Sequence, residues 1–264
     1  MIIDFHTHCF PDDLAQRAMK KLSQNSSLSY YHNGTVNGLK EVAKKAKIDK
    51  CIVLPIATKP EQTQTINRWV KSIQDECIIS FGTIHPKYQN WQDEINWLKE
   101  NNFKGIKFHP DYQDFFVDSK EMFPIYDAII QCGMIMIFHC GVDVAFNPPY
   151  HCTPDRLINL LNEFQDAKIV AAHMGGYRFF SDVQKYLIGK NVYLDTSFFF
   201  GEEYVGNIED ILKKHGIEKI LFATDSPWKD QAREIEYIRN LRLTDDEKDM
   251  ILGKNAMRLL ELNN

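Results

Sequence analysis

The chain has 264 residues, of which 44% are hydrophobic and 25% charged, a composition typical of a globular protein with a full core. Its net charge is −5, and no run of Lys and Arg forms a basic surface for nucleic acid or anionic lipid. No apolar stretch approaches the roughly 20 residues of a membrane-spanning helix. We therefore expect a small-molecule substrate, and neither a nucleic-acid nor a membrane partner.

The cysteines of the chain are scattered and never occur in C-x-x-C spacing; they are Cys9, Cys51, Cys77, Cys132, Cys140 and Cys152. No secretory signal peptide precedes the first strand-like run, which starts at Ile2. Reduced thiols are typical of the cytosol, so we expect a cytoplasmic protein. The sequence is compatible with a monomer or a homodimer.

Short apolar runs rich in β-branched residues alternate with stretches of helical periodicity. The strand-like runs are residues 2–6, 50–55, 78–84, 105–109, 134–139, 168–173, 191–195 and 219–224, and the helical stretches include residues 39–47, 67–73, 95–100, 123–130, 157–164 and 208–214. This order predicts parallel strands joined by crossover helices, and eight such repeats can close into a single-domain (β/α)8 TIM barrel over residues 1–264. An open doubly wound sheet is the main alternative, but no glycine-rich phosphate loop follows the first strand.

Two segments extend this pattern. Residues 9–37 form a connection longer than usual, polar around residues 23–33, for which we expect a short helix and a mobile loop that covers the barrel mouth as a lid. Near the other end, Thr244 and Glu247 have capping-box spacing ahead of an apolar-periodic run over residues 250–260. This run predicts a closing C-terminal helical segment.

Residues of metal-ligand type end several of the predicted strands. In the first strand, alternation of side chains places Asp4, His6 and His8 on one face. An H-x-H pair alone is equally typical of a hydrogen-bonded polar surface. However, His139 and His173 end the fifth and sixth predicted strands, and Asp225 follows the eighth.

The carboxyl ends of parallel strands meet at one rim of a barrel, so these five side chains are expected to converge there. Imidazole and carboxylate groups together favour a divalent cation, with zinc as the first expectation and manganese, iron or cobalt as alternatives. One ion per chain is the simplest expectation.

The chain resembles the amidohydrolase superfamily, in particular the branch of metal-dependent hydrolases and nonoxidative decarboxylases that includes aminocarboxymuconate-semialdehyde decarboxylase. The similarity covers essentially the whole chain and rests on four motifs: Asp4-Phe5-His6-Thr7-His8, Ala172-His173-Met174-Gly175-Gly176, Thr224-Asp225-Ser226-Pro227-Trp228 and Gly253-Lys254-Asn255-Ala256. The resemblance implies that His6, His8, His139 and Asp225 are the metal ligands. It also implies that His173 is an acid/base or electrophilic group beside the metal.

Such a site matches the needs of hydrolysis. A bound divalent cation lowers the pKa of water to about 7 and polarises a carbonyl group. Asp225 would then touch the metal and accept a proton, while His173 would stabilise the oxyanion or protonate the leaving group. For Asp4 two interpretations stay open: it orients a ligand imidazole, or it pairs with an inward-facing lysine.

The fourth strand carries Lys107 and His109 on one face, where binuclear relatives have a carboxylated lysine or a glutamate. A charged Lys107 beside Asp4 or a substrate carboxylate is the simpler interpretation, which favours a mononuclear site. His109, Arg178 and Trp228 are further candidates for substrate binding. For His109 a hydrogen bond to loop backbone is an equal alternative, and for Arg178 a merely exposed position is favoured. Phe198, Phe199 and Phe200 are candidates for an apolar wall, of which at least one is expected to pack between barrel and helix.

Four functions are compatible with these residues. The leading one is metal-dependent hydrolysis of an amide, ester or lactone, and the alternative is nonoxidative decarboxylation of an aromatic or unsaturated carboxylic acid. A TatD-like nuclease would share the H-x-H pair, but the strand-four glutamate and a basic groove are missing. A noncatalytic metal-binding protein is disfavoured because no ligand position is replaced.

Overall fold

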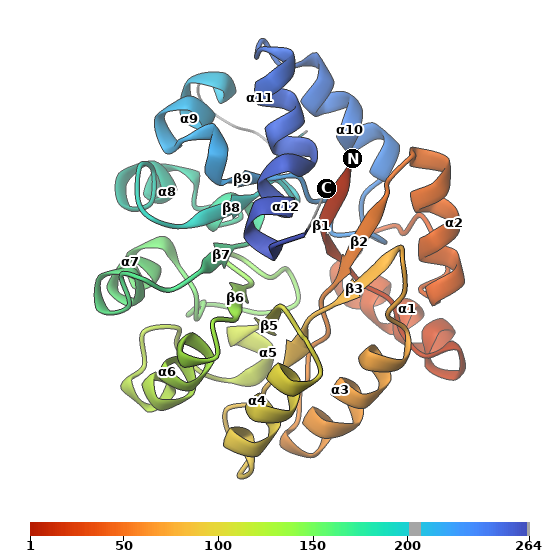
Figure 1. Ribbon diagram of the computed structural model, residues 1–264, viewed down its shortest axis with the longest axis vertical. Helices are drawn as coiled ribbons and strands as arrows, with labels where there is room; N and C mark the ends of the chain where they lie inside the picture. The colour runs from red at the N-terminus through yellow and green to blue at the C-terminus, as the bar shows by residue number, and fades with distance from the viewer. Residues whose placement is uncertain (201–206, 263–264) are drawn as a thin grey trace.

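Short parallel strands, consecutive along the chain, form the centre of the molecule (Figure 1). The computed structural model describes residues 1–200 and 207–262. The strands are β1 (Ile3–Thr7), β2 (Lys50–Val53), β3 (Ile78–Ser80), β4 (Gly82–Thr83), β5 (Gly105–Phe108), β6 (Ile135–Phe138), β7 (Ile169–Ala171), β8 (Tyr193–Asp195) and β9 (Ile220–Leu221). They pair in the orders β1-β2-β3 and β4 to β9. The predicted third strand is thus interrupted at Phe81, whose N–H donates to the Val53 carbonyl.

The last strand joins the first and closes the barrel. The Phe5 N–H donates to the Phe222 carbonyl at 2.9 Å, and Thr7 forms a parallel bridge with Ser226. The closed ring of parallel strands confirms the predicted TIM barrel.

Helices surround the ring (Figure 1). They are α1 (Asp12–Ser26), α2 (Val36–Ala46), α3 (Thr63–Ser72), α4 (Trp91–Glu100), α5 (Pro110–Gln113), α6 (Phe123–Gln131), α7 (Pro154–Glu163), α8 (Phe180–Tyr186), α9 (Ile208–His215), α10 (Gln231–Asn240), α11 (Asp245–Asp249) and α12 (Asn255–Leu260), with a π-helical turn at Met250–Lys254. The stretches predicted as helical fall within these helices or end one residue beyond them. No helix within the described residues is long and apolar enough to cross a membrane.

Alternate strand residues enter two separate apolar clusters. Ile52 and Ile137 belong to an inner cluster with Leu259 and Leu260 of α12, whereas Val53 and its equivalents pack outward against the helices. Helix α12 lies across one end of the ring (Figure 1). Hydrophobic packing thus fills one end of the barrel, and the carboxyl ends of the strands open at the other.

The long connection after β1 contains α1, a helix of 15 residues and therefore longer than the short helix expected. The loop behind it reaches the segment that follows Asp225, where the Tyr31 N–H donates to the Pro227 carbonyl at 2.8 Å. This contact holds the loop over the carboxyl ends of the strands. Its action as a lid stays a prediction.

The capping box at the start of α11 is confirmed. The Thr244 hydroxyl accepts a hydrogen bond from the Glu247 N–H at 3.3 Å, and the Glu247 carboxylate accepts one from the Thr244 N–H at 2.7 Å. Thr244→Ala should lower the free energy of unfolding by about 1 kcal/mol, because the cap is lost. Urea denaturation measures this loss. Thr244→Ser keeps the hydroxyl and should retain most of the stability, so equal losses in both variants would contradict the capping role.

Candidate functional site

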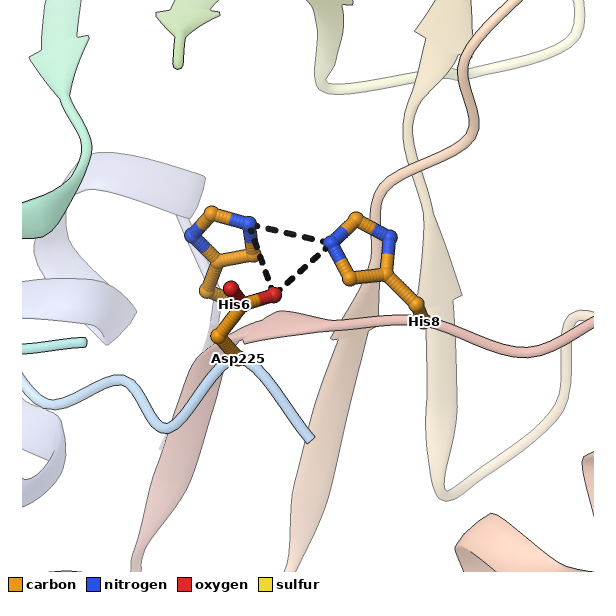
Figure 2. Close-up of side chains that lie close together, drawn as sticks. All are labelled: His6, His8 and Asp225. Atoms are coloured by element: carbon orange, nitrogen blue, oxygen red, sulfur yellow. Dashed lines mark hydrogen bonds and ion pairs between the residues drawn. The ribbon is translucent and has the colours of Figure 1, made fainter. Parts of the chain in front are cut away.

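Three of the residues predicted as metal ligands converge at the carboxyl end of the barrel (Figure 2). The Nε2 atom of His6 lies 3.2 Å from Nε2 of His8 and 3.5 Å from Oδ1 of Asp225. The His8 Nε2 atom lies 2.9 Å from the same carboxylate oxygen. Barrel closure positions the group, since the Asp225 N–H donates to the His6 carbonyl at 2.8 Å.

The first strand does not alternate regularly. Its register with β2 shifts between Asp4 and Thr7, so Phe5 packs in the inner cluster while the His6 ring still faces the site. Asp4 points instead toward α10. Its carboxylate accepts hydrogen bonds from the Thr224 hydroxyl at 2.6 Å and from Nε2 of Gln231 at 2.8 Å. The expectation that Asp4 orients a ligand ring or pairs with a lysine is therefore wrong, and regular alternation is the assumption that failed.

The hydrogen bonds of the two histidines fix where their protons lie. Nδ1 of His8 lies 2.9 Å from the Leu54 carbonyl, and Nδ1 of His6 lies 2.8 Å from Oδ2 of Asp195. Carbonyl and carboxylate oxygens only accept, so both Nδ1 atoms carry the hydrogen. Burial lowers the pKa of His6 well below its usual value, so this ring is neutral and its Nε2 atom presents a lone pair.

Asp225 supplies the negative charge of the group. Burial raises the pKa of its carboxyl, but the neighbouring His6 and His8 rings more than offset this and lower it to about 2. The group is therefore a carboxylate at neutral pH. Its Oδ1 atom is buried and faces Nε2 of His8 at 2.9 Å.

These donors fit a divalent cation. Two imidazole nitrogens and a carboxylate oxygen face one another while the Nδ1 hydrogens of both rings point elsewhere, an arrangement that a positive charge between them stabilises. Imidazole nitrogen and carboxylate oxygen are ligands for zinc and for manganese, iron or cobalt. The three residues are thus suited to hold such an ion.

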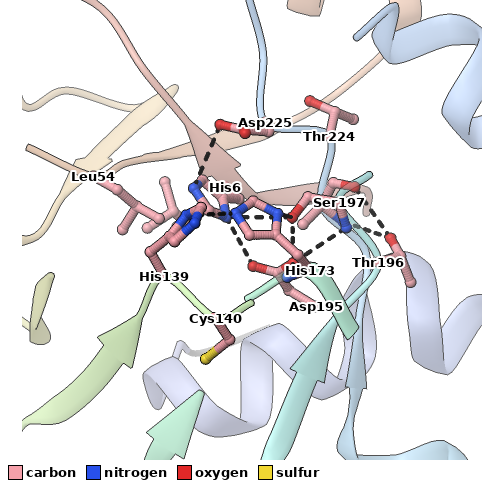
Figure 3. Close-up of polar contacts among 12 residues, drawn as sticks. His6, Leu54, His139, Cys140, His173, Asp195, Thr196, Ser197, Thr224 and Asp225 are labelled. Carbon is pink, nitrogen blue, oxygen red and sulfur yellow. Dashed lines mark hydrogen bonds and ion pairs between the residues drawn. The ribbon is translucent and has the colours of Figure 1, made fainter. Parts of the chain in front are cut away.

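The fourth predicted ligand, His139, does not join this group directly. It follows β6, and its Nδ1 atom lies 3.0 Å from Nε2 of His173 (Figure 3). Its own Nε2 atom is buried and has no hydrogen-bond partner within residues 1–200 and 207–262. Burial lowers the pKa of both rings, which are therefore neutral. The structure brings three of the four predicted ligands together and places His139 beside the predicted acid/base residue.

Lys107 is buried at the centre of the site, with its Nζ atom 3.4 Å from Nε2 of His6. Burial lowers the pKa of this lysine, while the carboxylates of Asp195 and Asp225 act in the opposite direction. The expectation that Lys107 lies beside Asp4 does not hold, because Asp4 turns out of the barrel. Lys107 instead contributes a cation next to the three converging atoms.

His109 and Asp143 form a second polar pair on the rim, with 3.1 Å between Nε2 and Oδ2. The His109 ring stacks on His139 with centroids 4.1 Å apart. Its Nδ1 atom accepts a hydrogen bond from the Tyr112 N–H at 3.4 Å, so Nε2 carries the hydrogen and donates to Asp143. His109, His139 and Asp143 offer three metal-ligand atoms close together, but this proton leaves no lone pair on His109 for a metal.

The remaining candidates lie farther from the converging atoms. Arg178 is exposed, as its alternative interpretation expected, and its guanidinium lies 5.2 Å from the Tyr177 ring centre. Trp228 is partly buried, and its backbone N–H donates a hydrogen bond to the backbone carbonyl of Asp225 at 2.9 Å. Phe198 meets the His173 ring edge to face at 5.8 Å, whereas Phe199 and Phe200 pack in the outer core.

Asp195 and Ser197 are site residues that the sequence analysis did not identify. Asp195 ends β8 and contacts the His6 ring, and the Ser197 hydroxyl lies 2.8 Å from Nδ1 of His173 (Figure 3). A polar residue at the end of a barrel strand is the same signal that identified His139 and His173. It was available at Asp195 and was not used.

Known proteins share this architecture. The profile of a family described as Amidohydrolase matches residues 3–262. An uncharacterised TIM-barrel protein from Bordetella bronchiseptica is 16% identical, with a TM-score of 0.78 and 98% of each chain covered. A 2,6-dihydroxybenzoate decarboxylase from Rhizobium is 13% identical, with a TM-score of 0.71, covering 100% of this chain and 99% of its own. No curated protein sequence matches.

A third similar structure is a 5-carboxyvanillate decarboxylase from Novosphingobium aromaticivorans with bound manganese. It is 14% identical, with a TM-score of 0.71, and the match covers 99% of this chain and 97% of that one. At such identities the structures show the shared barrel, and the profile, which spans nearly the whole chain, shows the family. The chain belongs to the amidohydrolase family and is a TIM-barrel enzyme of that superfamily.

Proposed function

We propose that this enzyme is a metal-dependent hydrolase of a small amide, ester or lactone. The observation that carries the proposal is the convergence of His6 Nε2, His8 Nε2 and Asp225 Oδ1 within 3.5 Å of one another, with the ring hydrogens directed elsewhere. The proposed ligands are these three residues, with His139 as the fourth. Zinc is the first choice, and the manganese in one similar decarboxylase supports manganese as the alternative.

When bound, a divalent cation supplies a water of pKa about 7 and polarises a carbonyl group. The protein must then accept, hold and return one proton. Asp225 is proposed as the first acceptor. Because its carboxyl has a pKa of about 2, it passes the proton on and does not retain it. His173 is neutral and lies at the same rim, so it is suited to hold the proton until the leaving group departs.

Decarboxylation is the second candidate, favoured by the similar decarboxylase structures and by the buried cation of Lys107. The surroundings of Lys107 argue for the hydrolase. The carboxylates of Asp195 and Asp225 already act on this buried lysine and favour its charged form. Arg178, the other predicted carboxylate partner, is exposed. Lys107 is therefore balanced by carboxylates of the protein itself, and the exposed Arg178 leaves no arginine of the predicted set buried in the site as a second partner for a substrate carboxylate, so hydrolysis is proposed first.

The proposals for nucleic-acid partners and for the cellular location rest on net charge and on the cysteines. A net charge of −5 disfavours the phosphate backbone of DNA, so a TatD-like nuclease is the weakest candidate. All six cysteines are free thiols, which supports the cytoplasm as the proposed location.

Metal analysis tests the site. Purified protein loaded with zinc and desalted should contain about one equivalent per chain, and His8→Gln should bind zinc at least about 100-fold more weakly because a ligand is lost. Asp143→Asn is the matched control, since the His109 to Asp143 pair is not a metal site, and should retain the ion. Mass spectrometry of the metal and chelator competition give both quantities. Loss of zinc in Asp143→Asn but not in His8→Gln would contradict the assignment, and two equivalents would indicate a carboxylated Lys107.

Activity tests the reaction. Loaded enzyme should release acid from an amide, ester or lactone in a substrate screen, and His173→Gln, assayed in saturating zinc, should lower kcat by about 10²- to 10⁴-fold, because a proton carrier is removed. Product analysis distinguishes the candidates. Release of carbon dioxide from an aromatic acid, with no hydrolysis in the screen, would contradict the hydrolase and favour the decarboxylase.

A further inference from the structure

Asp195 and Ser197 connect the three buried histidines at the centre of the site. We infer that Asp195, acting through Ser197, directs the hydrogen bonds of His173 and His139 so that His139 presents an unprotonated Nε2 atom to the site. Both are positioning residues in this proposal. The inference rests on the proposed function only for its catalytic meaning, since the hydrogen bonds exist in the protein alone.

The Asp195 carboxylate is the acceptor in each of its hydrogen bonds with His6, His173 and Ser197. Its Oδ1 atom accepts hydrogen bonds from the backbone N–H of His173 at 2.9 Å, from the backbone N–H of Ser197 at 3.1 Å and from the Ser197 hydroxyl. Its Oδ2 atom lies 2.8 Å from Nδ1 of His6. The side chain is fully buried, and only an ionised carboxylate can accept from all four donors. Asp195 is therefore the fixed acceptor from which the rest of the network follows.

Ser197 determines the direction of the hydrogen bond to the His173 ring. A hydroxyl has one hydrogen, and the Ser197 hydroxyl donates it in a hydrogen bond to the Asp195 carboxylate. The Ser197 oxygen is then an acceptor toward Nδ1 of His173, 2.8 Å away (Figure 3). His173 consequently carries its hydrogen on Nδ1 and has a lone pair on Nε2.

His173 in turn determines the direction of the hydrogen bond to the His139 ring. The Nε2 atom of His173 lies 3.0 Å from Nδ1 of His139, and a hydrogen bond there needs one donor and one acceptor. Because the His173 atom is the acceptor, Nδ1 of His139 donates. The remaining nitrogen, Nε2 of His139, then has a lone pair, and it is buried with no hydrogen-bond partner in the part of the chain that the structure describes.

The result is that His139 matches His6 and His8, although a different path sets its proton. His6 is oriented by Asp195 directly and His8 by the Leu54 carbonyl. Without the path through Ser197, the hydrogen of His139 is free to occupy either ring nitrogen. A proton on Nε2 blocks coordination there, so loss of the Ser197 hydroxyl should weaken metal binding without removing a ligand.

The ring hydrogens can be read directly by ¹⁵N NMR of metal-free, histidine-labelled protein, with His139→Gln and His173→Gln used for assignment. We expect Nδ1-protonated rings at both positions in the parent. Ser197→Ala should give a mixture of both ring forms at His173, while Ser197→Thr, which keeps the hydroxyl, should restore the parent form. The matched control is Ser80→Ala, since the Ser80 hydroxyl is buried without a hydrogen-bond partner among the described side chains and backbone, and it should change neither ring.

Chelator competition gives a second measurement. Ser197→Ala should lower zinc affinity by about 10-fold, and Ser197→Thr and Ser80→Ala should not. An Nε2-protonated His139 in the parent, or ring forms unchanged in Ser197→Ala, would overturn the inference. Because the NMR measurement needs neither metal nor substrate, it can fail while hydrolysis succeeds. Conversely, the expected ring forms in a protein that binds no metal would contradict the proposed function alone.

Discussion

The pairing of β1 with the segment after β9 is the interaction on which the site depends. Its backbone hydrogen bonds, including those from the Asp225 N–H to the His6 carbonyl and from the His8 N–H to the Ser226 carbonyl at 2.7 Å, join the two ends of the chain. Any opening of the barrel at this seam would separate the carboxylate from both histidines. Asp4 of β1 adds side-chain hydrogen bonds to this pairing, because its carboxylate accepts from the Thr224 hydroxyl and from Nε2 of Gln231 on the outer side of the barrel. Closure of the fold and assembly of the site are thus one event.

Within that frame, acceptors placed behind the histidines determine what the site can bind. The Leu54 carbonyl and the Asp195 carboxylate take the ring hydrogens of His8 and His6, which leaves lone pairs directed at Asp225. Lys107 adds one buried positive charge beside them. Imidazole nitrogens and a carboxylate arranged in this way are suited to a divalent cation. The proposed hydrolase builds on this metal site.

Much of this could be predicted from the sequence, because strand ends in a barrel share one rim. That rule placed His6, His8, His139, His173 and Asp225 at the same rim, and alternation within the fourth strand added Lys107. It failed where local geometry departs from the ideal: the register shift in β1 turns Asp4 outward. It also could not reveal the direction of a hydrogen bond, so the roles of Asp195 and Ser197 and the contact between His139 and His173 required three-dimensional positions.

The most direct test of the metal site is anomalous X-ray diffraction from crystals of the zinc-loaded protein, recorded on both sides of the zinc absorption edge. Our account predicts one strong peak per chain, about 2.0–2.2 Å from Nε2 of His6, Nε2 of His8 and a carboxylate oxygen of Asp225. A peak between His109 and Asp143 would contradict it, as would the absence of any peak in the loaded protein.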